Sequence, residues 1–333
     1  MLTFVIIILG SSFILYTLLG GADFGAGIVE TFNGKREELT ISKALAPVWE
    51  ANHVWLILAI VILFTGFPSV YASLSLVLHI PLMIVLIGII MRGSAFTFRH
   101  YDVIIGRSRK YYTFLFRVSS FITPIFLGMI LGAMILGRIT FDKSVGFYEM
   151  FMAPWLNFFC LVMGLFSASL FTYLAAVFLV GESEIERERM RYARFSKQVM
   201  IVTIILAAFV FVVAGQYGNS LVEKFLHSAV SIIMLLIAVL LCPVTWYFLN
   251  KEKNKTLYLR VGVGVQVTVI LIGWFYTQFP VLIAVKNGAP LDFYNTQAPP
   301  ATLHQLLIAL IAGLLLVIPG FVYLFQMFKV KNT

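Results

Sequence analysis

The sequence predicts an all-α polytopic membrane protein with about nine transmembrane helices. Of its 333 residues, 61% are hydrophobic and only 12% are charged. Soluble domains are roughly 45–50% apolar and about 25% charged, so this composition indicates a chain embedded in a bilayer. Apolar runs near the roughly 20 residues that a bilayer requires recur from one end of the chain to the other. They leave no room for a soluble domain of ordinary size.

Nine apolar runs are predicted to span the membrane. The first lacks a basic segment ahead of it and exceeds the usual 7–15 apolar residues of a signal peptide, so we expect a retained helix. The charged stretch 181–197 is expected to continue the fifth helix, with Glu–Arg pairs three residues apart, and 285–302 to form an irregular loop. The nine runs cover approximately residues 2–29, 44–65, 70–92, 113–137, 154–181, 198–214, 228–249, 261–284 and 303–327.

The basic residues lie in alternate connectors. Counting Arg92 at the end of the third run, 19 of the 24 Lys and Arg residues lie in the first, third, fifth and seventh connectors and the C-terminal tail. By the positive-inside rule this places the N-terminus outside and the C-terminus in the cytoplasm. The net charge of +9 therefore reflects topology, and no nucleic-acid partner is expected.

Nine helices divide naturally into two four-helix bundles plus one extra helix. We expect the first bundle within 1–137 and the second within 138–284. Residues 285–333 would then supply an outer loop, the ninth helix and a cytoplasmic tail.

Three acidic residues lie inside or at the end of the first two apolar runs, namely Asp23, Glu30 and Glu50. A charged side chain at the centre of a membrane helix costs about 2.5–3.5 kcal/mol on insertion scales, so these residues need a reason. By contrast, Arg92, Arg99 and Arg138 fall at predicted helix ends and are expected to reach the lipid headgroups.

The first two runs form a predicted antiparallel hairpin that turns near residue 37. Asp23 precedes the turn by 14 residues and Glu50 follows it by 13, so the two carboxylates reach similar depth. Glu30 lies two helical turns from Asp23, at the cytoplasmic mouth, and Glu50 shares a face with His53 three residues on. Carboxylate and imidazole chains are typical of proton relays, so these residues predict a polar inlet.

The same groups also permit a structural reading. Glu30 at the membrane interface and His53 within its helix could each bond neighbouring polar groups. They would then stabilise the fold without taking part in proton transfer. Asn52 belongs to the polar inlet, whereas Trp49 and Trp55 either anchor the helix at the interface or pack around the path.

The residues favour no cofactor site in this chain. A haem requires an axial His, Met, Cys or Tyr, and the five histidines show no pairing at helical spacing. Cys160 and Cys242 lie in apolar runs without metal-ligand spacing and are expected to be packing residues. The chemistry is therefore not expected to be complete within this chain.

Several motifs together resemble a known family. GGADFGAG (20–27) and APVWEANHVWL (46–56) are similar to the first two helices of subunit II of the cytochrome bd quinol oxidases. MRGSAFTFR (91–99) and SFITPIFLGMILG (120–132) resemble that family's third and fourth helices. Position 50 is Glu where many relatives have Asp, and the outer loop lacks the family's Pro-Ser-Ser run.

This resemblance implies the haem-free subunit of a heterodimeric quinol:O2 oxidoreductase in a prokaryotic cell membrane. Haem b, haem d and the quinol-oxidising loop would belong to the partner, subunit I. The acidic residues proposed in the family to line a cytoplasmic proton path map onto Asp23 and Glu50. A small third subunit, and a structural quinone or lipid in this chain, stay open.

Two other functions stay open from the sequence. In a proton-coupled secondary transporter, carboxylates near the midplane would bind the coupling ion. In a purely structural assembly subunit, Asp23 and Glu50 would only hold the complex together.

Overall fold

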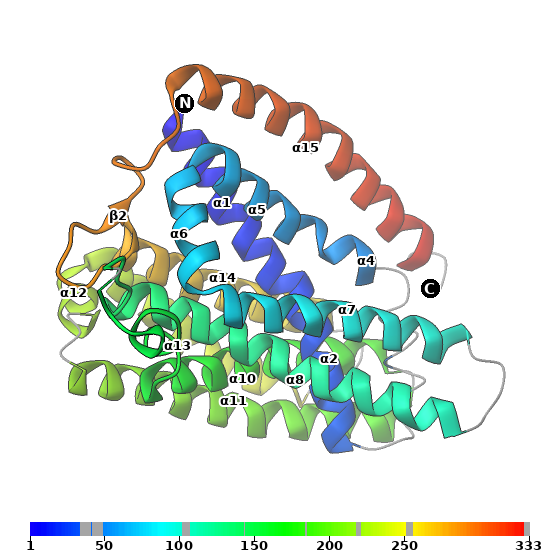
Figure 1. Ribbon diagram of the computed structural model, residues 1–333. Coiled ribbons are helices and arrows are strands. Elements are labelled where there is room, and N and C mark those ends of the chain that lie inside the picture. Colours follow the sequence, from blue (N-terminus) through cyan, green and yellow to red (C-terminus); the bar gives the residue numbers. More distant parts are fainter. Residues whose placement is uncertain are drawn as a thin grey trace.

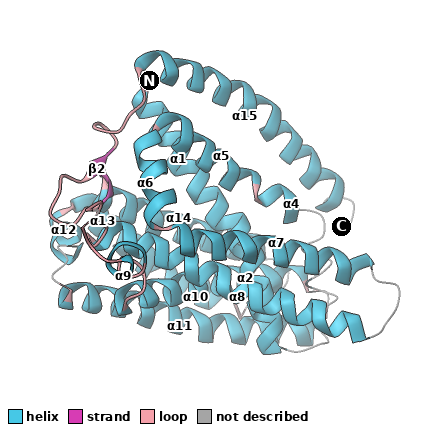
Figure 2. Ribbon diagram, viewed as in Figure 1, coloured by secondary structure: helices cyan, strands magenta, loops and turns pink. Residues whose placement is uncertain are grey.

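The computed structural model describes residues 1–33, 41, 49–101, 107–142, 144–183, 185–217, 221–250 and 256–329. Helices make up most of this part of the chain (Figure 2). At Trp49 and Glu50 only the helical backbone is described, so the predictions about these two side chains lie outside the described residues.

Within these ranges, eight helical segments are long and apolar enough to cross a membrane. A bent pair of shorter helices counts as a ninth if it forms one span, and the predicted all-α membrane fold of about nine helices is confirmed. The eight are Leu2–Phe32, His79–Arg99, Ser108–Leu136, Phe158–Glu182, Glu186–Gln216, Ala229–Phe248, Thr256–Gln278 and Pro300–Tyr323.

The first span changes helical type at its middle. It consists of α1 (Leu2–Leu15), a π-helical turn η1 (Tyr16–Gly20) and α2 (Gly21–Asn33). π-Helical turns inside α-helices are rare and occur frequently at functional sites. Asp23 therefore lies just beyond an irregularity that the apolar pattern did not indicate.

The second span is also interrupted. Its described part comprises α4 (Trp49–Asn52), α5 (Val54–Gly66) and α6 (Pro68–Val77), with α5 and α6 bent by 112° to one another. Pro68 occupies the first turn of α6, a position that proline favours because its missing N–H would be unbonded there anyway. The predicted third span, 70–92, is divided at Leu78 between α6 and α7 (His79–Tyr101), and the long apolar helix begins only at His79.

The remaining helices follow in chain order, with two corrections to the predicted boundaries. The charged stretch after residue 185 begins the sixth span, not an extension of the fifth, and its Arg189 Nε donates to Glu186 Oε2 at 2.8 Å. The eighth span ends at Gln278, before a short antiparallel hairpin of β1 (Val281–Ile283) and β2 (Leu291–Asp292). These helices are α8 (Arg107–Leu136), α9 (Phe147–Phe151), α10 (Phe158–Glu182), α11 (Glu186–Gln216), α12 (Leu221–His227), α13 (Ala229–Phe248), α14 (Thr256–Gln278) and α15 (Pro300–Lys329).

Glycines bring α2, α8 and α10 into close contact. A Cβ atom at Gly25 would lie 1.9 Å from the Phe171 carbonyl oxygen, so α2 and α10 touch through their backbones. A Cβ at Gly128 would lie 2.7 Å from Gly164 Cα, so α8 and α10 meet in the same way. Small residues at helix contacts permit this approach in membranes.

The helix α10 is the most enclosed of the spans, whereas α15 is the least buried and crosses the outer edge of the molecule (Figure 1). The candidate site lies where α2 meets α7 and α8. The helix α2 also packs on α10, the most buried of the described spans.

Candidate functional site

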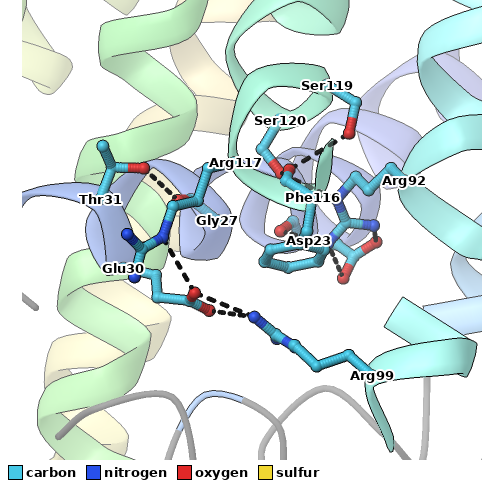
Figure 3. Close-up of polar contacts among 10 residues, drawn as sticks. All are labelled: Asp23, Gly27, Glu30, Thr31, Arg92, Arg99, Phe116, Arg117, Ser119 and Ser120. Carbon is cyan, nitrogen blue, oxygen red and sulfur yellow. Dashed lines mark hydrogen bonds and ion pairs between the residues drawn. The ribbon is translucent and has the colours of Figure 1, made fainter. Parts of the chain in front are cut away.

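Asp23 on α2 forms a buried ion pair with Arg92 on α7 (Figure 3). Arg92 Nη1 bonds Asp23 Oδ2, and Arg92 Nη2 donates to Oδ1 at 2.8 Å and to the Asp23 carbonyl oxygen at 2.7 Å. Neither side chain is more than 2% exposed. Bidentate guanidinium–carboxylate contact is among the strongest polar geometries in proteins, so this pair fixes α2 against α7.

Glu30, near the C-terminal end of α2, is bound by two arginines. Arg99 Nη1 lies 2.9 Å from both carboxylate oxygens, and Arg117 Nε of α8 lies 3.1 Å from Oε1. The Glu30 side chain is fully buried, whereas the Arg117 side chain is 25% exposed. Three helices thus meet at one carboxylate (Figure 3).

The two ion pairs repeat at a spacing of seven residues on both helices. Asp23 and Glu30 are seven apart, as are Arg92 and Arg99, and each acid is 69 residues from its arginine. Seven residues are about two helical turns, so the acids share one face of α2 and the arginines share one face of α7. The result is a column of two charged rungs inside the bundle.

The aromatic ring of Phe116 separates the two rungs. Arg99 Cζ lies 4.3 Å from the ring centroid and Arg92 Cζ lies 4.9 Å from it. A desolvated guanidinium over an aromatic face gains about 2 kcal/mol or more. Phe116 therefore offers each arginine an attractive surface that apolar aliphatic packing would not supply.

Small side chains make room for this column. Ser120 accepts from Arg92 Nε at 3.2 Å and donates to the Phe116 carbonyl at 2.6 Å. A Cβ at Gly27 would lie 2.1 Å from Ser120 Oγ, so only glycine allows α2 to approach α8 here. The GGADFGAG segment thus serves helix contact around Asp23.

The expectation that Arg92 and Arg99 reach the lipid headgroups is wrong, because both side chains are buried and paired with acids. Arg138 is exposed and its guanidinium lies 4.9 Å from the Tyr217 ring centroid. Sequence reasoning missed the arginine partners. The matched seven-residue spacing of acids and arginines is the signal that could have found them.

The polar residues of the second span lie beside the first span. Asn52 Nδ2 donates to the Leu19 carbonyl of η1 at 3.3 Å. His53 lies between α4 and α5, with its ring centroid 6.1 Å from those of Tyr16 and Phe24. Trp55 is buried and packs on Phe321 of α15, with centroids 5.4 Å apart, which supports packing over interfacial anchoring.

A sequence profile of the family described as cytochrome bd terminal oxidase subunit II matches residues 1–328. The chain belongs to this family. As a subunit II, it is a multi-pass component of an oxidoreductase complex in a bacterial cytoplasmic membrane. Membership implies a subunit I partner, haem in the complex and O2 as the substrate that is reduced.

Relatives with similarity along the chain include two from Bacillus subtilis (strain 168). The cytochrome bd ubiquinol oxidase subunit 2 is 24% identical over 322 residues, which cover 95% of this subunit II and 92% of that protein. A second, described as a putative cytochrome bd menaquinol oxidase subunit II, is 24% identical over 330 residues, covering 94% and 91%. The bd-I ubiquinol oxidase subunit 2 of Escherichia coli (strain K12) is 28% identical over 133 residues, or 39% of this chain and 35% of that protein.

A solved structure shares the fold of this subunit II. A chain of the bd oxidase from Geobacillus thermodenitrificans superposes with a TM-score of 0.79 at 20% identity, covering 99% of this chain and 98% of that one. Family membership favours an oxidase subunit over a secondary transporter.

The described residues of subunit II contain no group of three or more His, Cys, Asp or Glu side chains that could hold a metal ion. Cys160 is buried where α10 begins, with its backbone N–H donating to Asn157 Oδ1 at 3.0 Å. Cys242 Sγ accepts from Gln266 Nε2 at 3.0 Å. Both thiols take part in packing between helices.

Proposed function

We propose that this subunit II provides a cytoplasmic proton path to the O2-reducing site of a quinol:O2 oxidoreductase whose haems b and d belong to subunit I. The relatives named above are ubiquinol or menaquinol oxidases, which supports a quinol as the electron donor. The observation that carries the proposal is the column of two ion pairs along α2, which brings charged groups into the apolar interior.

The column has a direction. The Glu30 rung lies near the end of α2 and of α7, and near the start of α8, where Arg117 is still partly exposed. The Asp23 rung is two turns further in and fully enclosed. Because basic connectors favour the cytoplasmic side, the Glu30 end is the cytoplasmic mouth of the proposed path.

The five path residues divide into three roles. Asp23 and Glu30 neutralise arginines, and each carboxylate is held by at least two hydrogen bonds from a guanidinium. Guanidinium–carboxylate bonds of this kind are strong and geometrically fixed, so each acid suits the role of a fixed counter-ion. We assign proton exchange to Glu50 and His53, with Asn52 holding the second span against η1.

The assignment of the haems to subunit I follows the resemblance to the family. Among the described histidines, His79 Nδ1 lies 2.9 Å from the Leu76 carbonyl near the end of α6, and His227 Nδ1 lies 2.8 Å from the Glu223 carbonyl of its own helix. His53 lies among the Tyr16 and Phe24 rings.

The test is Glu50→Gln in the assembled heterodimer, with Glu50→Asp as the matched control. Oxygen consumption with quinol should fall at least about tenfold in Glu50→Gln, because general acid–base groups typically contribute 10²–10⁴-fold. Glu50→Asp keeps the exchangeable proton and should retain most of the rate. Full oxygen consumption by assembled Glu50→Gln contradicts the proposed path.

A second candidate is that the ion pairs only stabilise the fold and the complex. The complete burial of the Asp23–Arg92 pair favours this second candidate, because removing one partner of a buried ion pair strongly destabilises the protein. Asp23→Asn and Arg92→Gln separate the candidates when the rate is expressed per assembled complex. Lower assembly with an unchanged rate in both variants supports the structural role. A slower rate in assembled Asp23→Asn alone supports a proton path that depends on the fixed negative charge of Asp23.

A further inference from the structure

Four polar atoms near the start of α2 have no hydrogen-bond partner among the described residues. They are buried and belong to four side chains of the first two spans. The atoms are Tyr16 Oη, Asn52 Oδ1, His53 Nδ1 and Trp55 Nε1. Tyr16, Asn52 and Trp55 are each at most 6% exposed, so bulk solvent does not reach them.

These atoms gather where two spans lose their regular helix side by side. Tyr16 begins the π-helical turn η1, and His53 separates α4 from α5. The Tyr16 and His53 ring centroids are 6.1 Å apart, and Asn52 Nδ2 reaches back to the Leu19 carbonyl of η1. Trp55 belongs to the same buried cluster of side chains as Tyr16 and Phe24.

The position of Tyr16 depends on a glycine. A Cβ at Gly20 would lie 2.8 Å from the Tyr16 ring, so the ring packs directly on the glycine backbone. The Phe24 ring connects the cluster to the inner ion pair, because its centroid lies 6.1 Å from that of His53 and 4.9 Å from Arg92 Cζ.

Buried polar atoms in native proteins are bonded to protein or to ordered water, with few exceptions. Four unbonded atoms in one cluster point to a ligand with both donor and acceptor capacity. The cluster itself offers an indole donor, an amide acceptor, and a phenol and an imidazole that can do either. It carries no fixed charge, which fits a small neutral ligand rather than an ion.

We propose that Tyr16, Asn52, His53 and Trp55 bind internal water between η1 and the break at His53. A buried water molecule typically makes about three hydrogen bonds, so one or two molecules would bond all four atoms. The water site depends only on these four side chains. That it extends the proton path beyond Asp23 rests on the proposed function.

The chain contains matched controls for two of these residues. Tyr173 is as buried as Tyr16, but its hydroxyl donates to Gln266 Oε1 at 2.9 Å. Trp155 is as buried as Trp55, but its Nε1 donates to the Phe151 carbonyl at 2.7 Å. Each control differs from its counterpart in having a protein partner.

The test is radiolytic hydroxyl labelling of the intact oxidase in H2 18O, read by mass spectrometry. Radicals formed from bound internal water label adjacent side chains even when these are buried. We expect Tyr16 and Trp55 to be labelled several-fold faster than Tyr173 and Trp155. Equal, slow labelling of all four residues would overturn the water site.

Variants separate the water site from the proton path. Tyr16→Phe removes only the hydroxyl, and it should reduce the labelling of Trp55 severalfold while Trp155 is unchanged. Unchanged Trp55 labelling in that variant contradicts a shared water cluster. Labelling at Tyr16 and Trp55 together with a full oxygen-consumption rate in Glu50→Gln supports the water site and contradicts only the proposed path.

Discussion

Arg92 donates to both carboxylate oxygens and to the backbone carbonyl of Asp23. A single guanidinium therefore holds a side chain and the main chain of α2 at once, inside the bundle. Because neither residue is in contact with water, each depends on the other for its charge balance. The predictions below start from this pair and its neighbours.

The Asp23–Arg92 pair should show strong coupling in a double-mutant cycle. Asp23→Asn leaves a buried guanidinium without its counter-ion and should cost about 3–5 kcal/mol of stability. The double variant Asp23→Asn/Arg92→Gln should be less destabilised than the sum of the two single variants. Thermal denaturation of the purified complex measures this, and additive losses would contradict the pair.

Arg138→Gln is the control variant, because it removes an arginine that lies outside the two buried ion pairs. Arg138 is exposed, and its guanidinium lies 4.9 Å from the centroid of the Tyr217 ring. Its replacement should change the Tm of the complex little, because exposed charge interactions contribute about 0–1 kcal/mol.

The two arginines on Glu30 should differ in their importance. The Arg99 side chain is 1% exposed and that of Arg117 is 25% exposed, so water can replace part of the second contact. Arg99→Gln should therefore lower the Tm of the complex more than Arg117→Gln. A larger loss of Tm in Arg117→Gln would show that Arg117, and not Arg99, is the main counter-ion of Glu30.

Phe116→Leu should destabilise both rungs together. The substitution keeps an apolar side chain but removes the aromatic face that lies 4.3 Å from Arg99 Cζ and 4.9 Å from Arg92 Cζ. We expect a loss of about 2–4 kcal/mol from two cation–π contacts. Phe114→Leu, at a position 63% exposed on the same helix, is the control and should have little effect on the Tm.

Gly25→Ala should prevent normal packing of α2 on α10. Its Cβ would lie 1.9 Å from the Phe171 carbonyl oxygen, a backbone atom that cannot rotate away. Gly10→Ala is the matched control on the same span, since a Cβ there meets no atom within 4 Å. The yield of assembled complex should fall in the first variant only, and equal yields would contradict the close helix contact.

Much of the fold was predictable because membrane insertion is largely a local property. An apolar run of sufficient length must form a helix, since lipid offers no partner for its backbone groups. The prediction of about nine spans agrees with eight long helices and one bent pair that can form a ninth. A turn near residues 66–69 was predicted and α5 and α6 bend there, but the second break at Leu78, before α7, was not predicted because residues on both sides of it are apolar.

The candidate site was predictable only in part. Asp23 and Glu30 were recognised because an acid in an apolar run is unusual within its own segment. Their arginines lie 69 residues further along, near the end of another helix, where headgroup contact was equally consistent with the sequence. The role of His53 stays a prediction.

The sequence by itself determined the membrane class, the number of spans, the acids in the first span and the glycines that allow close contact. These follow from hydrophobicity and side-chain size, which act residue by residue. Only the tertiary structure decided which charges meet, that η1 faces the break at His53, and that Phe116 lies between two arginines. Those relationships depend on which helix faces touch, and that is set by packing among distant segments.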